Sequence, residues 1–288
     1  MIITVEPPAA VITDTEVRRM VFSPQQAQRY SRQFVLREIG VSGQKKLLGA
    51  KILVIGAGAL GSSALLYLAA AGVGTLGVAD HDEVDLSNLQ RKIIHASDRV
   101  GMEKTASAAL SLGALNPDVS VIRHDLRLAP DNILDVIAPY DFIIDATDRF
   151  ETKLLINDAC VLSAKPYSHA GVLRFFGQAM TYVPGQGPCL RCLLDQAPAR
   201  AETCAQVGVL GAVTGILGSI QATETIKYIL GTGQLLVGRM LVVDALSMRF
   251  DNIDIQGADP DCRVCGAHAS IRSLTENERD YVIGGCGI

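Results

Sequence analysis

The chain has 288 residues, of which 49% are hydrophobic and 19% are charged, and its net charge is −4. This composition can fill a large α/β core and excludes a disordered or fibrous protein. The acidic balance argues against nucleic acid as a partner, because proteins that bind it carry concentrated basic surfaces. The first twenty residues lack the basic start and apolar stretch of a secretory signal, so we expect a cytoplasmic protein.

The N-terminal part predicts a flexible arm over residues 1–22 and then a helix. Ser23 stands directly before a proline, which is typical of a helix start. We expect the helix to continue to Ile39 and to end at Gly40. Arg32 would then lie on a helix that precedes the nucleotide-binding part.

A glycine-rich turn follows the first predicted strand. Residues 51–55 predict a buried strand and residues 62–71 an apolar helix, and three glycines mark the turn between them: Gly56, Gly58 and Gly61. Backbone amides and the helix N-terminus at such a turn can hold phosphates. Asp80 follows a second strand at 75–79, where a carboxylate can accept both hydroxyls of a ribose. Alone, this fingerprint indicates a nucleotide, most often NAD or FAD.

The remaining elements predict an α/β fold. Helices and strands alternate over 102–113, 119–124, 132–138 and 142–145, which indicates a Rossmann-like, doubly wound parallel sheet. Four later segments predict antiparallel strands that extend this into a mixed sheet: 167–172, 178–183, 240–243 and 247–253. We expect a long loop at 195–206, and a buried or subunit-interface helix rather than a membrane span in the charge-free run 205–223.

Several motifs occur in the order of one family: Arg29–Gln33, the glycine turn, Leu86–Arg91, Asp145–Asp148 and two Cys-x-x-Cys pairs. With them, the chain resembles the ThiF/MoeB/HesA enzymes from about Arg29 to Cys265. The resemblance implies that ATP adenylates the C-terminal glycine carboxylate of a small ubiquitin-like sulfur carrier of the ThiS/MoaD type, which ends in Gly-Gly, and that pyrophosphate is released. A homodimer and a sulfurtransferase or cysteine desulfurase as sulfur donor are also implied.

The resemblance divides the chain into an adenylating domain over 23–270 and a C-terminal tail over 271–288. Within the domain, residues of about 50–150 would bind the nucleotide, and residues of about 165–270 would bind the carrier and zinc. The last five residues include a Gly-Gly pair. Carriers must end at that pair to be activated, so a flexible tail is the better interpretation here.

Adenylation needs cations rather than a general base, because a chain-terminal carboxylate has a pKa of about 3.5 and is already ionised at neutral pH. The resemblance implies these nucleotide-site residues: Arg91 and Lys104 as phosphate cations, Asp148 as the Mg²⁺ ligand, Asn88 as a phosphate contact, and Ser87 and Gln90 beside them. A single Lys or Arg is otherwise more often a surface charge. The alternative for Asp148 is a cap on the helix near Phe150. The usual asparagine after this aspartate is Arg149 here.

Two further residues have an implied role and a plain alternative. Arg32 resembles an arginine that family dimers insert into the neighbouring subunit's ATP site, and the alternative is an exposed helix arginine. Cys204 lies where some relatives form a thioester or acyl disulfide with the carrier, and the alternative is an unused thiol. Cys160 falls in a helical apolar pattern and is expected in the core.

Four of the seven cysteines form two Cys-x-x-Cys pairs: Cys189 with Cys192, and Cys262 with Cys265. In a chain without a secretory signal such pairs favour metal over disulfides. The pairs stand 69 residues apart, so the fold must bring them together. Four thiolates around Zn²⁺ leave no open coordination position, which predicts a structural site rather than a catalytic one.

Two alternative functions remain. An NAD-dependent oxidoreductase would explain the glycine turn and Asp80, but not the cations, Asp148 or the cysteine pairs. A nonenzymatic nucleotide-binding scaffold would bind ATP without catalysing pyrophosphate exchange. The sequence leaves the pathway open among thiamine, molybdopterin and other sulfur-containing products, because the adenylating core is shared among them.

Overall fold

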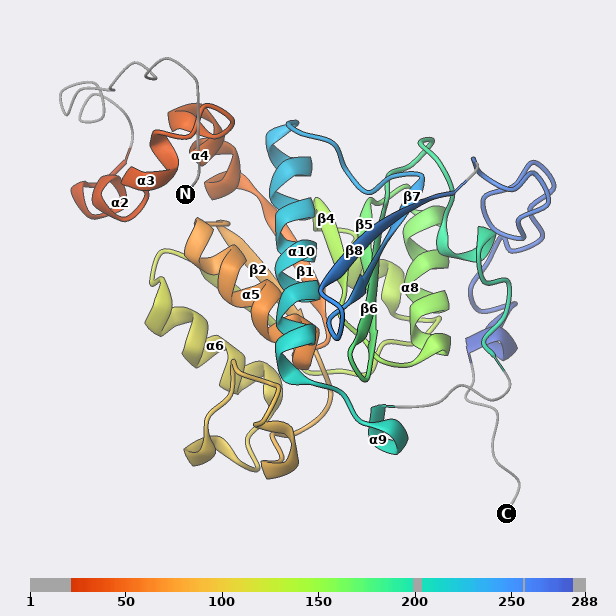
Figure 1. Ribbon diagram of the computed structural model, residues 1–288, viewed down its shortest axis with the longest axis horizontal. Helices are drawn as coiled ribbons and strands as arrows, with labels where there is room; N and C mark the ends of the chain where they lie inside the picture. The colour runs from red at the N-terminus through yellow and green to blue at the C-terminus, as the bar shows by residue number, and fades with distance from the viewer. Residues whose placement is uncertain (1–21, 199–203, 256, 282–288) are drawn as a thin grey trace.

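The computed structural model describes residues 22–198, 204–255 and 257–281 (Figure 1). Within these residues eight strands form one sheet in the order β3-β2-β1-β4-β5-β6-β7-β8. The strands are β1 Lys51–Ile55, β2 Thr75–Ala79, β3 Ser120–His124, β4 Phe142–Asp145, β5 Tyr167–Leu173, β6 Phe176–Tyr182, β7 Arg239–Asp244 and β8 Arg249–Asp254. The predicted α/β fold with a mixed sheet is confirmed.

The strands from β3 to β5 are parallel, and β6, β7 and β8 continue the sheet in antiparallel pairs. The strand expected at 167–172 joins the two parts of the sheet: β5 is parallel to β4, with Tyr167 opposite Ile143, and antiparallel to β6, with Tyr167 opposite Tyr182. The helix between β4 and β5 provides the crossover that parallel neighbours require. Antiparallel pairing therefore begins at the expected strand, on the side of β5 that faces β6.

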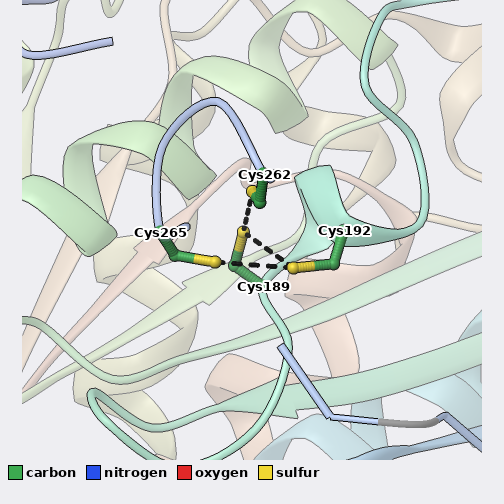
Figure 2. A group of neighbouring side chains, drawn as sticks. All are labelled: Cys189, Cys192, Cys262 and Cys265. Atoms are coloured by element: carbon green, nitrogen blue, oxygen red, sulfur yellow. Dashed lines mark hydrogen bonds between the residues drawn. The ribbon is translucent and has the colours of Figure 1, made fainter. Parts of the chain in front are cut away.

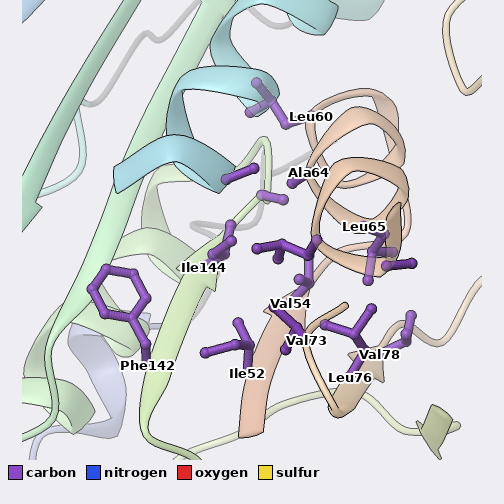
Figure 3. Close-up of a cluster of buried hydrophobic side chains, with 14 of the residues drawn as sticks. Ile52, Val54, Leu60, Ala64, Leu65, Val73, Leu76, Val78, Phe142 and Ile144 are labelled. Atoms are coloured by element: carbon purple, nitrogen blue, oxygen red, sulfur yellow. The ribbon is translucent and has the colours of Figure 1, made fainter. Parts of the chain in front are cut away.

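Helices cover both faces of the sheet (Figure 1). They are α2 Pro24–Arg29, α3 Ser31–Phe34, α4 Gly40–Gly49, α5 Ala59–Ala71, α6 Lys104–Leu115, α7 Ile133–Ile137, α8 Phe150–Leu162, α9 Cys204–Val207 and α10 Gly211–Leu230, with short 3₁₀ turns η1 Leu86–Asn88, η2 Ser97–Arg99, η3 Leu190–Cys192 and η4 Glu278–Tyr281. Alternate residues of β1 point to opposite faces: Ile52 and Val54 pack with α5 and α10 (Figure 3), and Leu53 and Ile55 pack with α7 and α8. The sheet therefore has one hydrophobic core on each face, and β1 contributes side chains to both.

The single N-terminal helix predicted up to Ile39 was wrong. Ser23 caps α2 as expected, but α2 ends at Arg29 and α3 begins at Ser31. The residue between them, Tyr30, is completely buried, and its hydroxyl accepts a hydrogen bond of 2.9 Å from the Asn116 side chain. Gly40 begins α4 instead of ending a helix. Burial of one aromatic ring therefore divides a segment that local pattern would make continuous.

The glycine-rich run 205–223 is divided between two helices, with Gly208 at a positive φ of 82° in the break. The longer helix, α10, lies against α5 (Figure 1). Gly218 allows this approach, since a Cβ there would lie 2.2 Å from the Leu60 carbonyl oxygen. Across the three described ranges, no helix combines the length and apolar character needed to cross a bilayer. Part of the expected loop at 195–206 lies outside the described residues.

Candidate functional site

The glycine turn connects β1 to α5 and depends on two close backbone approaches. Gly56 has a φ of 102°, and a Cβ there would lie 2.8 Å from the Ala146 carbonyl oxygen. A Cβ on Gly61 would lie only 1.9 Å from the Gly56 carbonyl oxygen. Gly58, directly before α5, has nothing within 4 Å of its Cβ position. The turn therefore leaves open space at the N-terminus of a thirteen-residue helix, where an anion is stabilised.

Asp80, at the end of β2, supports this turn with its carboxylate. Its Oδ2 accepts a 2.8 Å hydrogen bond from the Ala57 amide, and its Oδ1 accepts one of 3.0 Å from the Asp82 amide. Oδ2 has a second lone pair, which a ribose hydroxyl would use, while Oδ1 also faces the Lys104 ammonium at 3.5 Å. Asp80 thus shapes the glycine turn and remains able to accept from a ligand.

Lys104 is the first residue of α6 and is only 3% exposed. Its Nζ donates to Asp82 and lies 3.5 Å from Asp80 Oδ1. Burial favours the neutral amine, but the two carboxylates outweigh it and raise the pKa of Lys104 above its usual value. The alternative of an exposed surface lysine is wrong for Lys104, since its charge is fixed next to the glycine turn.

Arg91, the second expected cation, lies just after the short turn η1. Asp85 Oδ1 accepts a 2.8 Å hydrogen bond from the Ser87 amide and so begins this turn. Arg91 donates from Nη1 to the Ser87 carbonyl at 3.1 Å, and Lys92 donates from Nζ to Asn88 Oδ1. The side chains of Ser87, Asn88 and Arg91 are therefore held within one short turn.

The N-terminus of α10 packs against the end of this segment. A Cβ on Gly211 would lie 2.7 Å from the Gln90 carbonyl oxygen and 3.1 Å from the Arg91 Cα. The glycine-rich start of α10 thus leaves room for the backbone of Gln90 and Arg91. Helix α10 also contacts α5, so the cation segment and the glycine turn rest on the same helix pair.

Asp148 lies in the turn after β4, beside the glycine turn. Strand β4 pairs with β1, and the Ala146 amide donates to the Ile55 carbonyl at 2.9 Å. Asp148 itself is exposed, and the residue at the cap of α8 is Arg149, which makes no side-chain capping bond. The alternative role for Asp148, a cap on α8, is therefore not what the structure shows.

A buried charge cluster, which the sequence analysis missed, lies directly behind the Asp148 turn. Asp145 is completely buried and contacts Lys153 Nζ at 3.1 Å and His169 Nδ1 at 2.8 Å through Oδ2. Its Oδ1 accepts from the amide and hydroxyl of Thr147, at 3.0 and 2.7 Å. Burial alone would raise the pKa of Asp145, but Lys153 and His169 hold it well below its usual value. This cluster fixes the backbone that presents Asp148.

A histidine missed by the sequence analysis supports the other side of the glycine turn. The ring of His95 is buried, with Nε2 2.9 Å from the Ala57 carbonyl oxygen and Nδ1 2.9 Å from Ser107 Oγ. Burial lowers the pKa of His95, so the ring is neutral at pH 7. The only advance signal was its position four residues after Arg91.

The two Cys-x-x-Cys pairs meet in one cluster (Figure 2). All four sulfur atoms lie within 4.8 Å of one another, and the hydrogen-bonded pairs are 3.4 to 3.9 Å apart. Zinc bound tetrahedrally by sulfurs at about 2.3 Å would place the sulfurs about 3.8 Å apart. Hydrogen bonding within the cluster, above all with Cys189, lowers the pKa of Cys192 below its usual value. The donor set and its spacing therefore fit a closed zinc site.

An arginine from each cysteine loop reaches the C-terminal segment. Arg191 contacts Asp158 of α8 at 2.8 Å and Asp280 of η4 at 3.2 Å. Arg263 contacts the same Asp280 at 2.8 Å, and the Tyr281 hydroxyl donates to Asp158 at 2.7 Å. Residues 271–281, expected as the start of a tail, thus pack against the cysteine cluster and α8.

Arg32 lies on α3 and is exposed, away from the glycine turn. Its neighbour Gln33 donates to the Ala71 carbonyl at 3.5 Å, at the C-terminal end of α5. The glycine turn is at the opposite end of α5, about 20 Å away at 1.5 Å per residue. The structure therefore does not bring Arg32 to the nucleotide site of its own chain.

The backbone of Cys204 begins α9, and its side chain lies outside the described residues. The expected core position of Cys160 is confirmed, since it is completely buried on α8. The last five residues, with their Gly-Gly pair, also lie outside the described residues.

The fold and the site define a nucleotide-binding α/β protein with a buried cation and a four-cysteine cluster. The chain belongs to the ThiF family, whose model matches residues 30–264. It is 45% identical over 253 residues to the adenylyltransferase and sulfurtransferase MOCS3 of Culex quinquefasciatus, covering 87% of this chain and 58% of that protein. It is 46% identical over 243 residues to the SAMP-activating enzyme E1 of Haloferax volcanii, covering 84% of this chain and 89% of that protein.

Among solved structures, the chain is similar to E. coli MccB crystallised with ATP, with a TM-score of 0.73 and 24% identity over 82% of this chain and 74% of MccB. At this identity the likeness shows the fold alone. The chain spans less than two thirds of the length of the MOCS3 relatives, which are named for two activities.

Proposed function

We propose that this protein is an adenylyltransferase that uses ATP to activate the C-terminal glycine carboxylate of a small ubiquitin-like sulfur carrier. The observation that carries the proposal is the placement of Lys104 and Asp148 on the two sides of the glycine turn. Lys104, on α6, lies 3.5 Å from Asp80 at the end of β2, and Asp148 follows β4. The glycine turn follows β1, which lies between β2 and β4 in the sheet. Ligands of doubly wound folds bind at the carboxyl ends of such strands.

Each expected nucleotide residue has a position that suits its role. The amides after Gly56, Gly58 and Gly61 and the start of α5 would hold phosphate oxygens. Asp80 would accept the ribose hydroxyls with its free lone pairs. Ser87, Asn88, Gln90 and Arg91 would line the phosphate side, next to Lys104. This set contains cations and hydrogen-bond donors, and it gives the reaction electrostatic stabilisation.

The reaction follows from the charges. The carrier's carboxylate is the nucleophile and is ionised at neutral pH, so no residue must remove a proton. It forms a bond to the α-phosphorus of ATP, and the bond from that phosphorus to the bridging oxygen of pyrophosphate breaks. Arg91 and Lys104 would stabilise the charge on the leaving pyrophosphate. Mg²⁺ held by Asp148 would neutralise further phosphate charge.

Zinc at Cys189, Cys192, Cys262 and Cys265 would have a structural role. The closed set of four sulfurs leaves no position for substrate. The site would fasten the loop after β6 to the C-terminal segment, and Asp280 would reinforce it through the two arginines already described.

Arg32 fits a homodimer in which each chain contributes this arginine to the site of its neighbour. Its position far from its own glycine turn supports that role. The MOCS3 relatives are named as sulfurtransferases as well, which supports a later sulfur-transfer step. A sulfurtransferase or cysteine desulfurase would be the sulfur donor for that step. Cys204 would act only in that step. Assays with several carriers would identify the pathway that the carrier serves, whether thiamine, molybdopterin or another.

Carrier-dependent exchange between ATP and labelled pyrophosphate tests the proposal. We expect exchange with a cognate carrier that ends in Gly-Gly and none with the same carrier lacking its final glycine. Asp148→Ala and Arg91→Ala should each reduce the rate about 10²-fold or more, the scale of one lost preorganised contact. Equal exchange with the truncated carrier would refute the proposed reaction. ATP binding without exchange with any of a panel of carriers would favour a nucleotide-binding scaffold.

A further inference from the structure

One charged side chain beside the nucleotide site has no role in the proposed reaction. Lys92 is half-buried, and its Nζ donates to Asn88 Oδ1. The charge of the nearby Lys104 amine acts on this amine. Two ammonium groups close to each other repel, so a proton on one of the two amines is held less tightly when no anion is present.

The surrounding charges decide which amine gives up its proton. Lys104 is held by two carboxylates, Asp82 in direct contact and Asp80 at 3.5 Å. No carboxylate of the described residues contacts Lys92 within 4 Å, and its direct hydrogen-bond acceptor is a neutral amide oxygen. The ionisable groups around Lys92 come from the end of β2, the η1 turn, the segment after it and α6: Asp80, Asp82, Asp85, Arg91, His95 and Lys104.

We propose that Lys92 is an additional polyphosphate-binding cation, which takes up a proton from solvent when the triphosphate of ATP binds. The inference rests on the proposed binding of ATP at this site. Lys92 and Arg91 are consecutive residues, and Lys104 adjoins Lys92, so three cationic side chains gather where the phosphates are expected. The negative charge of a triphosphate would offset the repulsion among these three cations. The added proton forms an N–H bond at Nζ, and the ammonium then donates to phosphate oxygens.

Above about pH 8 the free protein has the protonation state that this step requires. Burial is the largest effect on Lys92, and the charges of Lys104 and Arg91 add to it, which together lower the pKa of Lys92 to about 8. Above that pH the amine is mostly neutral in the free protein. Bound phosphate raises the pKa of Lys92, so binding takes up a proton, and ATP affinity falls as pH rises from about 8 towards the pKa of the complex.

Titration calorimetry at pH 8.5 tests this. Mg-ATP is titrated in two buffers of different ionisation enthalpy, because the difference in measured heat gives the number of protons taken up. Free ATP contributes none, since its terminal phosphate, with a pKa of about 6, is already ionised. We expect wild-type protein to take up about three quarters of a proton per bound ATP, the neutral fraction of a group with a pKa of about 8.

Three variants separate charge from structure. Lys92→Arg should bind ATP about as well as wild type but take up no proton from this position, because arginine is always charged. Lys92→Met should bind ATP about 10-fold more weakly with no uptake, since one charge-assisted contact is lost. Lys45→Met, an exposed lysine on α4, is the matched control and should keep both affinity and uptake. AMP should cause little uptake in any of them.

Equal proton uptake in wild type and Lys92→Met would overturn the assignment to Lys92, while ATP binding itself would still stand. Uptake with AMP equal to that with ATP would also overturn it, because the proton would then not depend on the polyphosphate. Failure of wild-type protein to bind ATP would refute the proposed function and this inference together. Circular dichroism of each variant shows that it is folded before the titrations are compared.

Discussion

Asp145→Asn removes the negative charge from the buried cluster behind the Asp148 turn while keeping the size of the side chain. We expect the free energy of unfolding to fall by about 3–5 kcal/mol, the usual cost of removing one partner of a buried ion pair. The size of the effect follows from burial: Asp145 is completely buried, and Lys153, 3.1 Å away, is only 5% exposed. The Lys153 ammonium would be left buried with the Ala170 carbonyl, 2.8 Å away, as its acceptor.

The double variant Asp145→Asn with Lys153→Met isolates the charge pair. Removing both charges leaves no unpaired ammonium, so the double variant should be less destabilised than the sum of the single variants, by about 1–3 kcal/mol. Equilibrium urea unfolding, followed by far-UV circular dichroism, measures all four proteins. Additive single-variant effects, or a loss below about 1 kcal/mol for Asp145→Asn, would refute the view that this pair stabilises the turn.

The pH dependence gives an independent check on Asp145. The folded-state pKa of this carboxyl lies below its value of about 3.9 in the unfolded chain. Its stabilising contribution is therefore complete above about pH 4 and is lost as pH falls through the folded-state pKa. Wild-type stability should decrease more steeply below pH 4 than that of Asp145→Asn. Parallel curves in this range would contradict the assignment.

Three other outcomes follow from the site. Cys262→Ala should lower zinc content and melting temperature together, because a closed site contributes folding free energy; fully active, metal-free wild-type protein would exclude the zinc site. Cys204→Ala should keep carrier-dependent pyrophosphate exchange, and loss of exchange would mean that this cysteine acts earlier. Equal amounts of Arg32→Ala and Asp148→Ala chains, allowed to exchange subunits, should recover about one quarter of wild-type activity, since half the dimers are mixed and each has one complete site. No recovery after verified exchange would eliminate the in-trans role of Arg32.

Much of the nucleotide-binding half was predictable from local sequence. The strands at 51–55, 75–79 and 142–145 have the bounds that were predicted, because each is a short apolar run that ends at a glycine or an aspartate. The glycines were informative because their roles are steric: Gly61 has no room for a Cβ. The cysteine pairs were predictable from spacing, and the fold brings them into one cluster.

Features that depend on long-range contacts were not predictable in this way. Tyr30 interrupts the N-terminal helix because its hydroxyl meets Asn116, 86 residues away. His169 joins the buried cluster only because β5 pairs with β4, and the order of strands is not visible in a local pattern. The parallel direction of β5 relative to β4 is set by the crossover helix α8 between them, and the sequence analysis expected a helix near Phe150 without relating it to the direction of β5.

The cysteine cluster is completed only when the C-terminal part of the described chain is present. The four cysteines and their shared carboxylate neighbour Asp280 are five groups, and three of them lie within residues 262–280: Cys262, Cys265 and Asp280. A nascent or truncated chain that ends before Cys262 has only two of the four sulfurs, and Arg191 has Asp158 but no second carboxylate. The parallel half of the sheet is complete in such a chain, and the loop after β6 keeps its contacts with α8 through Arg191 and the Leu190 amide, which donates to Asn157 Oδ1 at 2.8 Å. Residues 262–280 thus add the contacts that join this loop to the C-terminal part of the described chain.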